Sequence, residues 1–299
     1  MTGVMWILLC LMGLCWGSFI NVVMTRTLIG ESIIFPPSKC PKCGHHLYWW
    51  HNIPILSFLL LKGKCYFCNK TISIRYPIVE IAGLCIFVFA FTKYISIVDA
   101  VAVILILSNF LVLAYTDIKE RKVSILQAFI IILAGVVFNR YDIYNALSGC
   151  VLSAGAVLAL GFFGRKVFKK ETFGVGDIYL LGALGSVAGF DKIILFVLYA
   201  LVIQFIFILP NYILGLIRNE QLETLRYLIL FGCACLFLYV FRNISFHGSK
   251  VLLILILSAI VFFAYKLILN LISSVKNQEN PLYCPLAPAI ALSCLIFLC

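Results

Sequence analysis

The sequence predicts an all-α polytopic membrane protein with about ten transmembrane helices and a small cytoplasmic zinc-binding domain. Of its 299 residues, 64% are hydrophobic and only 12% are charged, whereas a soluble domain is nearer half apolar and a quarter charged. Apolar runs long enough to cross a bilayer recur along the chain, and the sizeable polar segment among them contains two closely spaced pairs of cysteines. Backbone groups in lipid must be paired within the chain, so we expect these apolar runs to be helices.

Apolar runs of roughly 17–25 residues define the expected transmembrane helices. They cover residues 4–23, 77–94, 97–116, 123–139, 143–164, 178–190, 193–217, 224–241, 250–272 and 283–299. Two glycine pairs, Gly13-x-x-x-Gly17 and Gly185-x-x-x-Gly189, have the spacing that favours close helix contact in membranes. Such a match is weak by itself, and glycine that merely fills space is more common.

Positive charge predicts the orientation of these helices. With the N-terminus outside and residues 24–76 in the cytoplasm, 17 Lys and Arg face the cytoplasm, 5 face outside, and Lys266 lies within a span. The run Val4–Val23 has no cation before it, so we expect a retained span rather than a cleavable signal peptide. The net charge of +11 sits mostly in short turns rather than on one soluble face, so we expect no nucleic-acid binding.

The polar segment 24–76 contains two pairs of cysteines at C-x-x-C spacing. They are Cys40 with Cys43 and Cys65 with Cys68, and 21 residues separate the pairs. This arrangement is the usual form of a four-cysteine zinc site, and Gly44 and Asn69 follow where tight turns need them. Four thiolates fill a tetrahedral shell, which predicts a structural Zn²⁺. The alternative of a disulfide is disfavoured because the cytoplasm keeps thiols reduced.

Three histidines lie close to these cysteines and could replace a thiolate ligand. They are His45, His46 and His51. Since four cysteines suffice for the ion, we expect these rings to be solvated or interfacial. The remaining nine cysteines lie in or beside apolar spans, where a free thiol behaves as a small hydrophobic group.

Two aspartates stand where apolar runs meet the predicted cytoplasmic face. Asp117 ends the run 97–116, and Asp177 follows Gly174 and Gly176, which allow the backbone to bend or to pass close to a ligand. Ionisable groups at this depth are costly and usually functional. Two facing carboxylates can share a proton, so that one acts as general base on a water and the other donates to a scissile carbonyl.

The same two aspartates are also compatible with two simpler roles. Asp117 and Asp177 could cap helix N-termini, where carboxylates are favoured. They could also carry protons in a transporter, although that function gives no reason for the two thiol pairs.

Several further stretches carry recognisable motifs. They are Gly17–Val23, Ser38–Gly44, Asn52–Ser57, Gly63–Cys65, Ile72–Glu80, Phe173–Asp177, Leu181–Gly185 and Pro285–Pro288. In this order, with the thiol pairs and the G-x-G-D signature, the chain resembles the bacterial type IV prepilin peptidases that also methylate the new N-terminus. The resemblance covers most of the chain.

The resemblance implies a catalytic dyad of Asp117 and Asp177 supported by the glycine loop. It implies cleavage of the short basic leader of prepilins or pseudopilins, in pilus or type II secretion systems, at the cytoplasmic side of the inner membrane. It also implies methyl transfer from S-adenosylmethionine to the exposed α-amine. Glu80, Arg75 and Asn21 are the candidate residues for that second reaction.

The implied domains are a first helix at 1–23, a zinc-binding methyltransferase-type domain at 24–76 and a peptidase domain at 77–299. The usual family has eight spans, so the chain is expected to carry an additional hairpin at 218–280. Two local departures are Lys122–Ile125, where the family has Ile-Pro-Asn, and Tyr179, where it has lysine. These departures support an alternative function, a degenerate zinc-bearing assembly module of a pilus or secretion machine.

Overall fold

The computed structural model describes residues 3–168, 174–200, 202–204, 206, 230 and 286–298. The chain divides into two compact units, one formed by Met1–Ile203 with Pro285–Cys299 and the other by Gln204–Cys284. Every element named below belongs to the first unit. The expected hairpin at 218–280 lies almost entirely outside the described residues.

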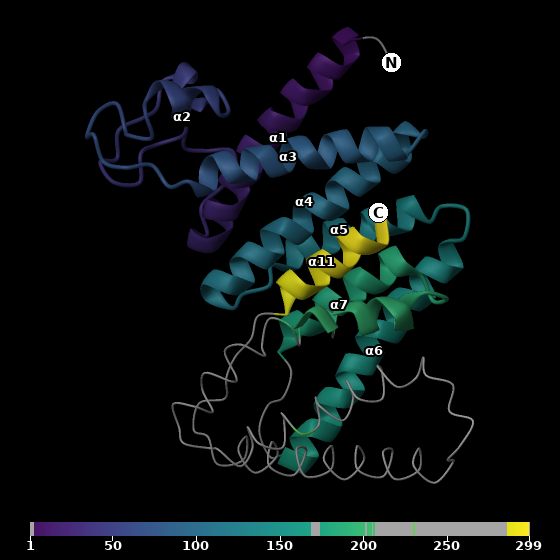
Figure 1. The fold of residues 1–299 in the computed structure, drawn as a ribbon. Coiled ribbons are helices and arrows are strands. Elements are labelled where there is room, and N and C mark those ends of the chain that lie inside the picture. The colour runs from purple at the N-terminus through teal and green to yellow at the C-terminus, as the bar shows by residue number, and fades with distance from the viewer. Residues whose placement is uncertain are drawn as a thin grey trace. The chain divides into compact units, whose positions relative to one another are not determined.

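The described elements are helices (Figure 1). In chain order they are α1 (Gly3–Ile29), the 3-10 helix η1 (Trp49–Asn52), α2 (Leu56–Leu60), α3 (Arg75–Lys93), α4 (Ile97–Glu120), α5 (Ile125–Phe138), α6 (Ile143–Phe168), α7 (Val175–Ala188) and α11 (Ala287–Leu298). Two isolated antiparallel bridges, Lys39 with His46 and Lys64 with Thr71, lie in the segment between α1 and α3. The all-α prediction is confirmed for this part of the chain.

Four of the described helices, α1, α3, α4 and α6, are long and apolar enough to cross a membrane, so the protein is a membrane protein. Helices α5, α7 and α11 are apolar but shorter. The apolar runs locate these helices well, although α1 continues to Ile29 and α4 to Glu120, beyond their predicted ends at 23 and 116. The total of about ten spans stays a prediction.

Helix α4 is the most enclosed of the long helices. In the 18-residue apolar stretch of α4, 61% is buried inside the protein, against 28–33% in the corresponding stretches of α1, α3 and α6. Phe110 and Leu113 of α4 pack in one cluster with Ile131 of α5, Leu180 of α7 and Ile290 of α11, all at most 1% exposed. In lipid, packing of this kind holds helices together without help from the exclusion of water. The last turn of α4 is therefore firmly placed.

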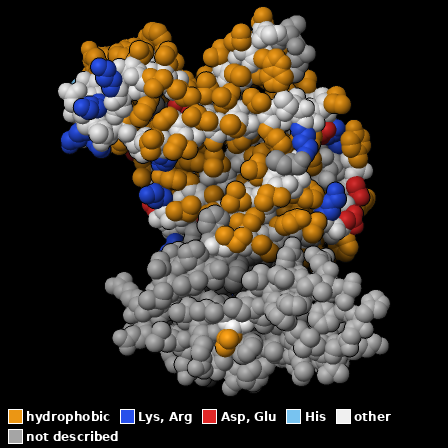
Figure 2. All heavy atoms as spheres, viewed as in Figure 1, with side chains coloured by type: hydrophobic (Ala, Val, Ile, Leu, Met, Phe, Trp, Pro, Cys, Tyr) orange, Lys and Arg blue, Asp and Glu red, His pale blue; other side chains and the backbone are white. Residues whose placement is uncertain are grey.

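The outer surface of the described helices is apolar. In Figure 2 hydrophobic side chains cover most of this face, whereas Lys and Arg gather over the segment around α2. Val4 and Ile7 of α1 and Phe162 of α6 are each more than 60% exposed. Large apolar groups at the surface are expected where lipid is the solvent.

Helices α1 and α3 approach each other at backbone distance through glycines. A Cβ atom on Gly17 would lie 2.5 Å from the Cα of Glu80, and one on Gly83 would lie 2.6 Å from the Cα of Gly17. A Cβ on Gly13 would lie 2.8 Å from the Cα of Leu84. Real Cβ atoms do not approach backbone this closely, so the expectation that Gly13 and Gly17 merely fill space is wrong.

Helices α6 and α7 make a second contact of this type. A Cβ on Gly185 would lie 2.3 Å from the carbonyl oxygen of Gly149. Gly189 ends α7 with a φ of 72°, in the left-handed region that favours glycine. The structure therefore also requires glycine at both positions of the second pair, at Gly185 for the close contact with α6 and at Gly189 for its backbone conformation.

Three further aspartates, Asp99, Asp142 and Asp191, have structural partners near the ends of helices. Asp142 Oδ1 accepts the backbone N–H of Asn145 at 3.1 Å, which caps the start of α6. Asp191 Oδ2 accepts from Asn145 Nδ2 at 3.1 Å. Asp99 pairs with the guanidinium of Arg140.

We predict that Gly17→Ala destabilises the protein, because the new methyl group meets the backbone of α3. Overpacking of this kind typically costs about 1–3 kcal/mol. Thermal unfolding in detergent should show a lowered midpoint. Gly155→Ala in α6 is the matched control, since a Cβ there meets nothing within 4 Å and alanine favours a helix. Equal midpoints for the two variants would contradict the proposed role of Gly17.

Candidate active site

Two turns of the same design carry the four cysteines. The N–H of Cys40 donates to the carbonyl oxygen five residues later, and the N–H of Gly44 donates back to the carbonyl of Cys40, both at 2.9 Å. Cys65 and Asn69 repeat these two bonds at the same distances. Gly44 and Asn69 have φ values of 74° and 55°, which Gly and Asn adopt most readily. The predicted tight turns are confirmed.

The two turns bring their sulfur atoms together. The Sγ atoms of Cys40, Cys43, Cys65 and Cys68 lie within 4.8 Å of one another. In a tetrahedral zinc site with Zn–S bonds of about 2.3 Å, the sulfurs are about 3.8 Å apart, so a small contraction completes the shell. The donor set therefore fits Zn²⁺.

The second turn favours the charged form of a ligand. The backbone N–H of Cys68, together with the backbone N–H of Phe67 and the thiol of Cys40, lowers the pKa of the Cys65 thiol to about 7 against the opposing effect of burial. The thiolate is the form that binds metal ions.

The histidines are not part of the cysteine cluster in the described structure. His45 and His46 are exposed, as expected. The same expectation for His51 is wrong, because this ring is only 8% exposed and contacts the rings of Trp50 and Tyr66. Its Nδ1 accepts the backbone N–H of Tyr48 at 3.2 Å, so the Nε2 of the neutral ring carries the proton. Burial lowers the pKa of His51 and keeps it neutral.

Asp117 lies in the last turn of α4 and is 3% exposed. Its Oδ2 accepts the backbone N–H of Ala287, the first residue of α11, at 2.9 Å. Helix α4 ends just beyond it at Arg121, which adopts the left-handed conformation and turns the chain toward α5. This bend keeps the carboxylate among the helices that surround α4.

Asp177 is the third residue of α7. Its Oδ2 accepts the backbone N–H of Gly174 at 3.0 Å, which caps the helix. Burial raises the pKa of the Asp177 carboxyl group, the N–H of Gly174 lowers it, and the negative charge of Asp117 raises it in addition. The end of α4 and the start of α7 thus lie near enough for the charge of one acid to affect the other.

The two glycines before Asp177 differ in what they do. A Cβ on Gly176 would lie 2.9 Å from the Cβ of Val123, so this position needs glycine for the close approach of the turn between α4 and α5. A Cβ on Gly174 would have Asp177 Oδ2 as its nearest neighbour, at 3.7 Å, and the backbone there is extended. The backbone conformation at Gly174 is thus one that any residue adopts, while the close approach at Gly176 is to the protein itself. Phe173 lies outside the described residues.

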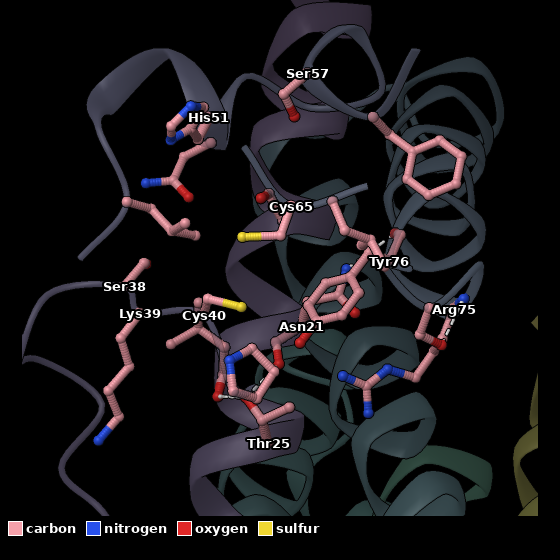
Figure 3. A pocket seen from close by; sticks show the side chains of 18 of the residues that line it. Asn21, Thr25, Ser38, Lys39, Cys40, His51, Ser57, Cys65, Arg75 and Tyr76 are labelled. Carbon is pink, nitrogen blue, oxygen red and sulfur yellow. Dashed lines mark hydrogen bonds between the residues drawn. The ribbon is translucent and has the colours of Figure 1, made fainter. Parts of the chain in front are cut away.

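A cavity of about 1080 Å³ lies between α1, the cysteine segment, α3 and the C-terminal end of α4 (Figure 3). Asn21, Arg75 and Glu80, the three candidates for the second reaction, all line it. Asp117 and Asp177 are not among its lining residues in the described structure. The candidate residues therefore form two separate groups.

The apolar side of this cavity contains two buried oxygen acceptors. Asn21 is 2% exposed, its Nδ2 donates to the carbonyl of Tyr76 at 3.0 Å, and its Oδ1 has no hydrogen-bond partner among the described residues. Glu80 is 8% exposed, and its Oε2 accepts the backbone N–H of Ile55 at 2.7 Å. A buried acceptor without a partner is costly, and such oxygens suit a ligand that is cationic or carries N–H groups.

Arg75 lies between two aromatic rings at the edge of the same cavity. Its guanidinium carbon is 4.8 Å from the ring centre of Tyr76 and 4.7 Å from that of Tyr115. Its Nη1 donates to the Tyr115 hydroxyl, and its Nε has no hydrogen-bond partner among the described residues. Stacking of this kind holds a cation in place without neutralising it.

Sequence reasoning missed two members of these groups. Tyr115 stands two residues before Asp117, and nothing in its local pattern indicates a partner 40 residues away in Arg75. The donor to Asp117 is the backbone of Ala287, which has no side-chain signal at all.

Two family models match consecutive parts of the chain. The Bacterial Peptidase A24 N-terminal domain matches residues 11–94, which include the cysteine turns and most of the cavity residues. The Type IV leader peptidase family matches residues 104–209, which include Asp117 and Asp177. No solved structure matches the chain.

Curated relatives carry the same two regions. A prepilin leader peptidase/N-methyltransferase from Myxococcus xanthus is 34% identical over 184 residues, covering 60% of this chain and 55% of that protein. One from Klebsiella pneumoniae is 34% identical over 193 residues, covering 61% of this chain and 85% of the relative. One from Vibrio cholerae is 29% identical over 215 residues, covering 67% and 84%. The match thus spans little more than half of the Myxococcus relative and most of the other two.

The order of the two matched regions, the extent of the Klebsiella match and the apolar helices agree with one another. This chain belongs to the type IV prepilin leader peptidase family of membrane enzymes.

Proposed function

We propose that this chain removes the short basic leader from prepilins or pseudopilins at the cytoplasmic face of a bacterial inner membrane and then methylates the new N-terminus. The observation that carries the proposal is the pair of acids Asp117 and Asp177, which lie buried at the end of α4 and half-buried at the start of α7, within the region that matches the Type IV leader peptidase family. The substrate class comes from the relatives, which are named prepilin leader peptidase/N-methyltransferase. The cytoplasmic side follows from the excess of cations on that face.

In the proposed cleavage the two carboxyl groups share one proton. The ionised member takes a proton from a water, whose oxygen attacks the carbonyl carbon of the scissile bond. The protonated member donates its proton to the carbonyl oxygen. Collapse of the tetrahedral intermediate breaks the C–N bond, the amine takes a proton, and the leader departs with a new carboxyl group.

The proposed site of methyl transfer is the cavity beside α4. The new α-amine has an ordinary pKa of roughly 7.7–8.0 and must lose a proton before it can react. Glu80 is placed to accept that proton and the free Oδ1 of Asn21 to hold the amine by a hydrogen bond, since both line the cavity. Arg75 suits the carboxylate of S-adenosylmethionine, which would supply the methyl group.

The four cysteines are proposed to hold a structural Zn²⁺ in the domain at 24–76. The ion would link the two turns and replace the large core that so short a segment lacks. The hydrogen bond from Ile55 to Glu80 joins this segment to α3. Zinc is therefore expected to support the cavity rather than to react in it.

We predict that Asp117→Ala or Asp177→Ala lowers leader cleavage at least about 100-fold, the scale of a lost acid–base group. Incubating membranes with a prepilin and following its mobility shift measures the rate. Asp142→Ala is the matched control, because it removes an acid that caps a helix without approaching the dyad. Cleavage at the normal rate by either dyad variant would remove that residue from the mechanism.

We predict that Glu80→Gln keeps cleavage but lowers methylation at least about 10-fold. Glutamine retains an oxygen for the N–H of Ile55, so the local fold is expected to survive while the base is lost. Mass spectrometry of processed pilin distinguishes methylated from unmodified N-termini. Glu120→Gln is the control, because Glu120 pairs with Lys122 at the surface. A fully methylated product from the Glu80 variant would exclude this residue as the base.

We predict that Cys43→Ser removes most of the zinc, which is expected at about one ion per chain, and lowers the unfolding temperature. Elemental analysis of the purified protein gives the metal content. Cys85→Ser is the control, since Cys85 is an exposed thiol in α3 outside the cluster. Unchanged zinc in the Cys43 variant would contradict the four-cysteine site.

A further inference from the structure

The C-terminal helix places its first residue on Asp117. The N–H of Ala287 donates to Asp117 Oδ2 at 2.9 Å, across 170 positions of sequence. Ala287 is 1% exposed and Asp117 is 3% exposed, so the bond is shielded from solvent. Helix α11 contacts α4 and α7, the two helices that carry the proposed dyad, and Figure 1 shows it beside them.

At the start of α11, the N–H of Ala287 has its acceptor outside the helix. The first N–H groups of a helix have no acceptor within it and are usually capped by a polar side chain. Leu286, which precedes the helix, has no polar side chain, and Pro288 in the second position has no N–H. The N–H of Ile290 already donates to the carbonyl of Leu286 at 3.2 Å. The carboxylate of Asp117 therefore takes the place of the missing cap.

Asp177 has a matching arrangement. Its Oδ2 accepts the N–H of Gly174 at 3.0 Å, at the start of α7. Each carboxyl group of the pair is thus held at one oxygen by a backbone donor that begins a helix. A backbone N–H inside a packed helix cannot rotate away, so it holds a charged group without reorganisation during the reaction.

We propose that the backbone amide of Ala287 is a positioning group for cleavage, which fixes the orientation of the Asp117 carboxylate. This inference rests on the proposed peptidase function. It gives the C-terminal helix a direct part in the reaction, because the first residue of this helix presents its backbone N–H to Asp117.

The test removes this N–H and leaves the helix. Ala287→Pro does so at the first helical position, where proline is well accommodated. Ala287→Val is the matched control, because valine has as many side-chain carbons as proline and keeps the N–H. Replacing Ala287 by lactic acid through nonsense suppression turns the amide into an ester and removes the N–H with no added bulk.

Cleavage of a prepilin is measured as kcat and KM for each variant, with zinc content and unfolding temperature as checks of the fold. We expect the proline and ester variants to lose about 10- to 100-fold in kcat at an unchanged KM, and to lose clearly more kcat than Ala287→Val, which shows the effect of added bulk alone. Methylation of pilin that has already been cleaved should persist in all of them.

Three results would overturn the inference. The ester variant could keep the wild-type kcat, the valine variant could lose as much kcat as the ester, or the loss could lie in KM alone. Asp117→Ala in the same assay distinguishes failure of the proposed peptidase function from failure of this inference. Normal cleavage by Asp117→Ala would contradict both the dyad and the positioning role. Loss of cleavage by Asp117→Ala together with a fully active ester variant would contradict the positioning role alone.

Discussion

Backbone N–H donors hold each of the three acids at the proposed sites. Asp117 accepts from Ala287, Asp177 from Gly174, and Glu80 from Ile55. A carboxylate buried among apolar helices is costly unless it is hydrogen-bonded, and a main-chain donor meets that need without adding a competing positive charge. Each donor must therefore be held next to its acid. The core cluster around α4 holds α7 and α11, whose starts supply two of these donors or lie next to them. The loop at Ile55 supplies the third.

Helix α4 is common to both proposed reactions. Asp117 lies against the start of α11, whereas Tyr115 and Lys119, two residues to either side, line the cavity. Residues two positions apart on a helix point in nearly opposite directions. The end of α4 therefore supplies two faces with different chemistry. A new N-terminus released at the dyad would therefore have to move around the end of α4 to reach Glu80. Transfer between two sites in one protein would limit the time during which an unmodified amine is exposed.

Sequence patterns predicted the parts of the molecule that depend on local spacing. The C-x-x-C pairs with Gly44 and Asn69 gave the correct turns, and the run 97–116 located α4. What they missed depends on contacts between distant segments. Gly13 and Gly17 looked like filler because their partners lie in another helix, α3. His51 looked like a surface residue because two of the rings around it, those of Tyr66 and Phe67, come from the second cysteine turn. The amide of Ala287 leaves no trace in a sequence, since every residue other than proline has one.

The contact between Gly176 and Val123 links the two stretches that surround the proposed dyad. Val123 belongs to the stretch that departs from the usual family pattern after the first aspartate, and a Cβ on Gly176 would lie only 2.9 Å from the Cβ and from one Cγ of Val123. The G-x-G-D glycine is thus required by a neighbour rather than by its own loop. The size of the residue at position 123 is consequently limited by its contact with Gly176 at the start of α7. Any bulkier residue there presses on the start of α7, so related chains should trade volume between these two positions instead of changing either one alone.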